Sequence, residues 1–166
     1  ALLARAYPIF ESVLVCFVGE SSKGKTITTQ LALSPWGSPL KEGKGLLTTW
    51  YGTYQGIMDN LKNIYGIPVG IDDTSLIHND EMDITEFVYQ FTNSTTKQAL
   101  HSDGTRREQH HWKTIGITSS EVSMLSQMEN KSGIRVRFIE IGSEKFTESA
   151  ENAENIKKGI SENYGH

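Results

Sequence analysis

Residues 19–26 read Gly19-Glu20-Ser21-Ser22-Lys23-Gly24-Lys25-Thr26. This octet decides the expected fold, because it fits the pattern G-x-x-x-x-G-K-[ST] of a loop that joins a β-strand to an α-helix. The run 12–18 before it is apolar and rich in β-branched residues, as expected of a buried parallel strand. The run 27–33 after it can continue as a helix. The octet therefore lies in the context in which the pattern predicts a phosphate-binding loop.

The residue types of the octet suit a nucleoside triphosphate. Gly19 and Gly24 permit backbone angles that a Cβ atom would penalise, so successive N–H groups can turn inward. Together with the helix N-terminus they form a pocket for phosphate oxygens, and we expect all of residues 19–26 to line it. Lys25 is expected to reach the β- and γ-phosphates as a catalytic group, and Thr26 to offer its hydroxyl to Mg²⁺. The alternative interpretation is a surface turn rich in glycine and serine.

Composition excludes several classes of protein. With 166 residues, 37% of them hydrophobic, the chain is long enough for one domain with a core. No apolar run approaches the length of a membrane span, so we expect no membrane contact. The single cysteine, Cys16, excludes an internal disulfide and favours a reducing, cytoplasmic setting. The ends resemble interrupted helices, so we expect residues 1–166 to be a single domain excised from a longer protein.

Strands and helices alternate along the chain, which predicts an α/β fold with a mostly parallel five-stranded sheet between two layers of helices. A hairpin over about 97–112 precedes the fourth strand. The expected strands are 12–18, 45–50, 69–71, 114–118 and 134–141. The expected helices are 1–10, 25–34, 54–65, 83–92 and 151–164, with a short one from about 120.

Two acids end the third predicted strand. A P-loop NTPase needs a carboxylate there to hold the Mg²⁺ shell, and Asp72 fits this role. The next acid usually polarises the attacking water, which assigns Asp73 as the catalytic base. Glutamate is more common at that position, and Asp73 is one methylene shorter, so Glu121 or Glu20 could assist. The alternative is an ordinary polar turn.

The fourth predicted strand ends in hydroxyl side chains. A hydroxyl at this strand end can contact the γ-phosphate or orient water, and Thr118 and Ser119 are the candidates. We assign Ser119 as the catalytic one. The alternative is that Ser119 or Ser120 caps the following helix.

Basic residues gather around the predicted hairpin, whose tip contains the turn signal Asp103-Gly104. The net charge is −4, so contact with a nucleic acid must be local. Lys97, Arg106 and Arg107 are the candidates for binding DNA phosphates. The alternatives are an arginine finger that reaches a neighbouring subunit and a solvent-exposed edge protected by charge.

Two further groups have open interpretations. Arg135 and Arg137 alternate along the fifth predicted strand and could also serve as arginine fingers, although a half-exposed strand explains them equally well. We interpret Trp36, Trp50 and Trp112 as packing residues.

The chain resembles a P-loop NTPase family known as domain of unknown function 927, encoded largely by bacteria, phages and mobile genetic elements. The resemblance covers nearly the whole chain and extends through 155–165. The residues that carry it are the octet 19–26, Trp36-Gly37, Thr48-Thr49-Trp50, Ile71-Asp72-Asp73, Lys97, Asp103-Gly104, Trp112-Lys113 and Thr118-Ser119-Ser120-Glu121.

The resemblance implies an AAA+ or RecA-like core that couples ATP hydrolysis to DNA unwinding in a hexameric ring. It places Lys25, Thr26, Asp72, Asp73 and Ser119 around ATP and Mg²⁺, and the hairpin residues near single- or double-stranded DNA, because similar hairpins enter the channel of AAA+ and superfamily-three ring helicases. We therefore expect the motor domain of a phage or mobile-element helicase. The alternatives are a nucleotide-dependent switch or DNA-loading module with little hydrolysis, and a small-molecule phosphotransferase.

Overall fold

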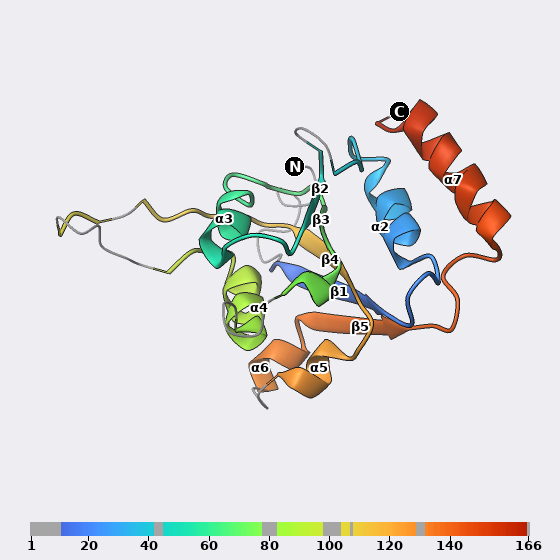
Figure 1. Ribbon diagram of the computed structural model, residues 1–166. Helices are drawn as coiled ribbons and strands as arrows, with labels where there is room; N and C mark the ends of the chain where they lie inside the picture. Colours follow the sequence, from blue (N-terminus) through green and yellow to red (C-terminus); the bar gives the residue numbers. More distant parts are fainter. Residues whose placement is uncertain are drawn as a thin grey trace.

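A five-stranded sheet with the strand order β2-β3-β4-β1-β5 forms the centre of the computed structural model (Figure 1). The structure describes residues 11–41, 45–77, 83–97, 104–106, 108–128 and 132–165. All four pairings between neighbouring strands are parallel, so the predicted α/β fold is confirmed. The strands are β1 (Val13–Val18), β2 (Leu47–Thr49), β3 (Val69–Asp72), β4 (Ile115–Ser120) and β5 (Phe138–Gly142).

Helices cover both faces of the sheet. On one face lies α2 (Lys25–Leu33), with α7 (Ala150–Asn163) packed beside it (Figure 1). Towards the other face lie α3 (Tyr54–Asp59), α4 (Ile84–Asn93), α5 (Met124–Gln127) and α6 (Ser132–Arg135), and a short 3₁₀ helix, η1 (Thr74–Leu76), follows β3. No helix in the described part of the chain combines the length and the apolar character needed to cross a membrane.

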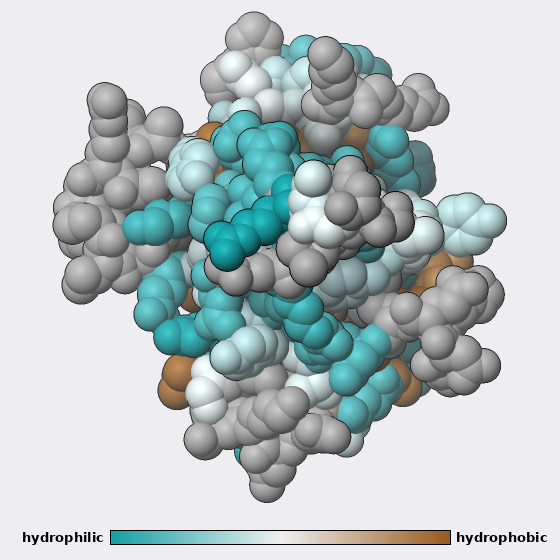
Figure 2. All heavy atoms as spheres, turned by 90° about the vertical axis from the view of Figure 1, so that its left-hand side faces the viewer, coloured by the Kyte–Doolittle hydropathy of each residue, from teal (hydrophilic) through white to brown (hydrophobic). Residues whose placement is uncertain are grey.

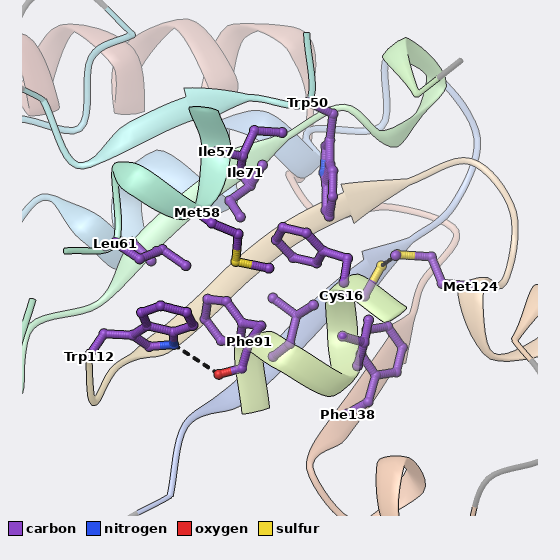
Figure 3. Packing of buried hydrophobic residues seen from close by; sticks show 14 residues of the cluster. Cys16, Trp50, Ile57, Met58, Leu61, Ile71, Phe91, Trp112, Met124 and Phe138 are labelled. Carbon is purple, nitrogen blue, oxygen red and sulfur yellow. Dashed lines mark hydrogen bonds between the residues drawn. The ribbon is translucent and has the colours of Figure 1, made fainter. Parts of the chain in front are cut away.

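The larger hydrophobic cluster lies between the sheet and helices α3 and α4 (Figure 3). Its aromatic rings form a row in which the centroids of Trp50 and Phe87 lie 4.6 Å apart and those of Phe91 and Trp112 lie 6.4 Å apart. Both buried indoles have hydrogen-bond acceptors, and that of Trp112 donates to the carbonyl of Phe91 at 2.9 Å. Packing roles are thus confirmed for Trp50 and Trp112, whereas Trp36 is 48% exposed and lies outside the core.

Cys16 lies in the same cluster and contacts the sulfur of Met124 at 3.6 Å (Figure 3). Burial, assisted by the charge of Glu140, raises the pKa of its thiol to about 12. The thiol is therefore protonated at neutral pH and acts as a small packing group.

Three predicted elements differ from the observed ones. The helix expected over 54–65 ends at Asp59 and continues as turns, with Asn63 in a left-handed conformation. The strand expected over 134–141 begins only at Phe138, since β1 begins at Val13 and has no residues to pair with 134–136. β4 continues to Ser120, so the next helix begins later than predicted, at Met124. The helix expected over 1–10 lies outside the described residues.

Gly116 marks the closest approach of the sheet to the aromatic row. A Cβ atom there would lie 2.6 Å from atoms of both Leu14 and Phe91. We expect Gly116→Ala to lower the free energy of unfolding by about 1–3 kcal/mol through overpacking, measured by denaturant titration. The matched control is Gly159→Ala in α7, where a Cβ atom meets nothing within 4 Å. That change should instead stabilise the helix by about 0.5–1 kcal/mol, and equal effects of the two changes would contradict the packing argument.

Candidate functional site

The octet forms a tight loop between β1 and α2. Gly24 precedes the first residue of α2 in a left-handed conformation with φ 91°, and Ser22 also has a positive φ of 60°. A Cβ atom at Gly24 would lie 2.6 Å from the hydroxyl of Thr147, so both conformation and space require glycine. Gly19 differs from the expectation, because its φ is not in the left-handed region. It is instead a point of close approach, where a Cβ atom would lie 2.7 Å from the carbonyl oxygen of Ser143.

Lys25 folds back over this loop. Its ammonium donates to the carbonyl oxygens of Gly19 at 2.6 Å and Glu20 at 2.7 Å. These bonds hold a positive charge beside the backbone N–H groups at the start of α2. Both features attract an anion to the same place.

A polar cluster joins the loop to the ends of β3 and β4. The hydroxyl of Ser119 donates to Asp72 Oδ1 at 2.6 Å, and the hydroxyl of Thr26 donates to Asp72 Oδ2 at 3.0 Å. Asp72 is only 1% exposed. The parallel arrangement explains this meeting, since the carboxyl ends of neighbouring strands share one edge of the sheet. The structure thus brings three of the predicted site residues into direct contact.

A fourth member of the cluster was not predicted. The ammonium of Lys41, from the connection between α2 and β2, forms an ion pair with Asp72 Oδ2 at 2.9 Å. The surrounding sequence is a loop rich in glycine, proline and lysine, and no local pattern marks Lys41 as a site residue.

The second acid, Asp73, lies beside the cluster but has a different environment. Its backbone N–H donates to the hydroxyl of Ser119 at 3.1 Å, which fixes the turn after β3. Its carboxylate caps η1 and accepts from the N–H and the hydroxyl of Ser75 at 3.1 and 2.5 Å. Of the two alternative acids, Glu121 lines the same cleft as Asp73, whereas Glu20 forms an ion pair with Lys23 at 3.4 Å.

The two candidate hydroxyl residues of β4, Thr118 and Ser119, have different contacts in the structure. Thr118 is fully buried, donates to the carbonyl of Ile71 at 2.6 Å and accepts from the Trp50 indole, so it holds the sheet to the core. Ser119 faces Asp72. The capping alternative is wrong, because Ser123 caps α5.

The loop and the cluster lie at a cleft of about 830 Å³. One wall consists of residues 21–27 and Gln30, together with Asp73 and 119–121. Gly19 and Glu20 do not line this cleft, although the sequence predicted that the whole octet would. The opposite wall consists of Lys145, 147–150 and the first turns of α7, and the sequence analysis did not foresee it. Phe146 attaches this wall to the loop, since its N–H donates to the carbonyl of Lys23 at 2.8 Å and its ring lies 5.3 Å from that of Phe17.

Comparison with known proteins identifies the family to which the chain belongs. Residues 1–111, out of 166, match the family described as Domain of unknown function (DUF927). The chain belongs to this family. It is also 34% identical to a solved structure described as "SCCmec type IV Cch - active helicase", with a TM-score of 0.81 over 99% of this chain. The match covers 29% of that helicase, so the chain spans less than a third of its length. No curated protein matches the chain.

Residues 104–106 and 108–110 of the predicted hairpin of this DUF927 domain extend away from the sheet (Figure 1), and its predicted turn residue Asp103 lies outside the described residues. An antiparallel bridge between Thr95 and His111 forms its base. Lys97 forms an ion pair with Glu86 of α4, Arg106 is exposed, and Arg107 lies outside the described residues. Figure 2 shows that the coloured residues on this side of the domain are mostly hydrophilic.

Charge pairing continues along the other arm of the hairpin. Lys62 forms an ion pair with Glu108 at 2.8 Å, and its hydrogen bond and charge lower the pKa of that carboxyl group. Part of the basic character expected from the sequence is therefore neutralised within the DUF927 domain itself.

The two arginine-finger candidates do not alternate along a strand, which corrects the expectation. Arg135 is an exposed residue of α6, and Arg137 precedes β5, where its side chain forms an ion pair with Glu11 at 2.5 Å. Both lie near the amino ends of the strands, whereas the cleft of the DUF927 domain lies at their carboxyl ends. Neither can therefore act on the cleft of its own domain without a large movement.

Proposed function

We propose that this domain binds and hydrolyses ATP as the motor module of a phage or mobile-element DNA helicase, with an AAA+ type of P-loop core. The observation that carries the proposal is the contact of Thr26, Asp72 and Ser119 at the edge of the sheet where the phosphate loop lies. In the order β2-β3-β4-β1-β5, strand β4, which carries Ser119, lies between β3 and β1. Strand β3 ends in Asp72, and β1 leads into the phosphate loop. The likeness to an active helicase over 99% of the chain supports the same conclusion.

The oxygen atoms of the cluster are suitable ligands for Mg²⁺. This ion prefers oxygen ligands and is usually held by one or two protein groups together with phosphates and water. The Thr26 hydroxyl and the Asp72 carboxylate are two such groups and already lie 3.0 Å apart. Bound Mg²⁺ would neutralise charge on the β- and γ-phosphates.

The remaining site residues have separate tasks in this proposal. Residues 19–26 hold the phosphate chain through their amides, and Lys25 contacts the β- and γ-phosphates. Ser119 fixes the Asp72 carboxylate by its 2.6 Å hydrogen bond and can orient the attacking water. Asp73 or Glu121, which line the same cleft, accept the proton of that water.

DNA and further copies of the chain are the proposed partners. Lys97, Arg106 and Arg107 on the predicted hairpin would contact the phosphates of single- or double-stranded DNA. In a hexameric ring, Arg135 or Arg137 would reach the nucleotide of a neighbouring subunit. The extension of residues 104–106 and 108–110 away from the sheet supports the contact with DNA (Figure 1).

The test is ATP hydrolysis by the full-length protein with and without single-stranded DNA. We expect measurable turnover that DNA stimulates several-fold. Binding of ATP without turnover would favour the nucleotide-dependent switch instead. The 2.5 Å contact between Asp73 and Ser75 supports that possibility, because it occupies one of the two candidate bases. Failure to bind ATP at all would contradict both functions.

A further inference from the structure

The ion pair between Lys41 and Asp72 has no role in the function proposed above. Asp72 Oδ1 accepts from the hydroxyl of Ser119 at 2.6 Å, and Oδ2 pairs with the ammonium of Lys41 at 2.9 Å. The hydroxyl of Thr26 lies within hydrogen-bond distance of both oxygens, at 3.2 Å from Oδ1 and 3.0 Å from Oδ2. Hydroxyl groups supply hydrogen bonds but no positive charge. Lys41 supplies the countercharge that a carboxylate with 1% exposure requires.

Lys25 is the other cation expected near this point, but it is engaged elsewhere. Its ammonium is bound to the carbonyl oxygens of Gly19 and Glu20. The charge of Asp72 is therefore balanced by a residue from outside the phosphate loop, which reaches in from the connection between α2 and β2.

Two cations cannot share the same carboxylate oxygen without strong repulsion. We propose that Lys41 is the resident countercation of Asp72 in the nucleotide-free domain, and that Mg²⁺ arriving with a nucleotide displaces it. This inference rests on the proposed function, since it takes Asp72 as a residue that serves Mg²⁺. It makes the connection between α2 and β2 respond to the occupancy of the cleft.

The surroundings of Lys41 allow its ammonium to dissociate from Asp72. Its side chain is 43% exposed, so the released ammonium can enter water at little cost. Lys41 also lines a second cavity of about 410 Å³, together with Thr48 and Asn60, and no residue of the phosphate loop lines that cavity.

Amine acylation measured by mass spectrometry tests the displacement directly. The full-length protein is treated briefly with an acetylating reagent in four conditions: without ligand, with Mg²⁺, with a non-hydrolysable ATP analogue and chelator, and with the analogue and Mg²⁺. We expect acylation of Lys41 to rise several-fold only when both ligands are present. Lys25 should become protected by the analogue, and Lys62, which pairs with Glu108, should not change.

The outcomes separate this inference from the proposed function. Protection of Lys25 with unchanged or reduced acylation of Lys41 would leave nucleotide binding intact and overturn the displacement. No change at either lysine would overturn both.

A variant gives a second, independent measurement. Lys41→Met keeps most of the unbranched side chain and removes the competing charge. Mg²⁺ should therefore increase the affinity for the analogue by about tenfold more than in the wild type, the value of one charge-assisted hydrogen bond. The matched control, Lys62→Met, should show the wild-type dependence on Mg²⁺. An equal or weaker dependence in Lys41→Met would contradict the inference.

Discussion

Replacing Lys25 with alanine is expected to lower the rate of ATP hydrolysis by about three orders of magnitude, because in the proposed function it removes the positive charge that would contact the transferred phosphate. The geometry supports a large effect. The ammonium is held beside the start of α2 by the carbonyl oxygens of Gly19 and Glu20, at 2.6 and 2.7 Å, so it is already positioned for an anion. Steady-state phosphate release by the full-length protein, with single-stranded DNA present, measures the loss.

The control for this variant is Lys158→Ala, which removes an exposed lysine of α7 that does not line the cleft. Its turnover should equal that of the wild type. Because Lys25 also bonds to its own loop, thermal unfolding of both variants must show that the domain remains folded. A folded Lys25→Ala protein with more than about a tenth of wild-type turnover would contradict the role given to this residue.

Sequence alone predicts those parts of the site that are formed by consecutive residues at the end of a strand. The octet could be recognised as a loop of this kind because the strand before it and the helix after it are adjacent to it in the chain. Asp72 could be found because an acid that ends a buried strand must lie at the same sheet edge as the loop. The parallel pairing of β3 and β4 then explains why Ser119 meets it.

The choice between Thr118 and Ser119 shows where sequence reasoning ends. Neighbouring residues of a strand point to opposite faces, so only one of the two hydroxyls can face the acid. The alternation alone does not say which hydroxyl that is, because the register of β4 against β3 decides it; the choice of Ser119 agreed with the family resemblance. In the structure Thr118 pairs with Ile71 and turns towards Trp50, which leaves Ser119 for Asp72.

Long-range contacts explain what was missed. Lys41 reaches Asp72 across 31 positions of sequence, and Phe146 binds the loop carbonyl of Lys23 from the far end of the chain. Neither contact has a local pattern. The error at Arg135 has a related cause: its alternation with Arg137 indicates a strand, but a strand also requires a partner. In the register of β1 and β5, Arg135 would stand opposite Glu11, which lies outside β1.

Replacing Asp72 with asparagine is expected to separate activity from stability more cleanly than any other change in this site. The amide keeps the size of the carboxylate and one oxygen that can accept from Ser119 or Thr26, while Lys41 can turn to water. Because an ion pair with a buried member contributes little net stability, the free energy of unfolding should stay within about 1 kcal/mol of the wild type. The negative charge that we propose to serve Mg²⁺ is lost, so turnover at saturating ATP should fall by about 10²–10³-fold.

The measurements are phosphate release, the affinity for a fluorescent ATP analogue, and denaturant unfolding. Nucleotide should still bind, since the loop amides and Lys25 are unchanged, but Mg²⁺ should no longer increase the affinity. Glu162→Gln, at an exposed position of α7, is the matched control for loss of one acidic charge and should behave as the wild type. If Asp72→Asn retained Mg²⁺-dependent turnover, the cluster of Thr26, Asp72 and Ser119 would be a structural junction between α2, β3 and β4, and the site for the metal would have to be sought among the other acids of the cleft, beginning with Asp73.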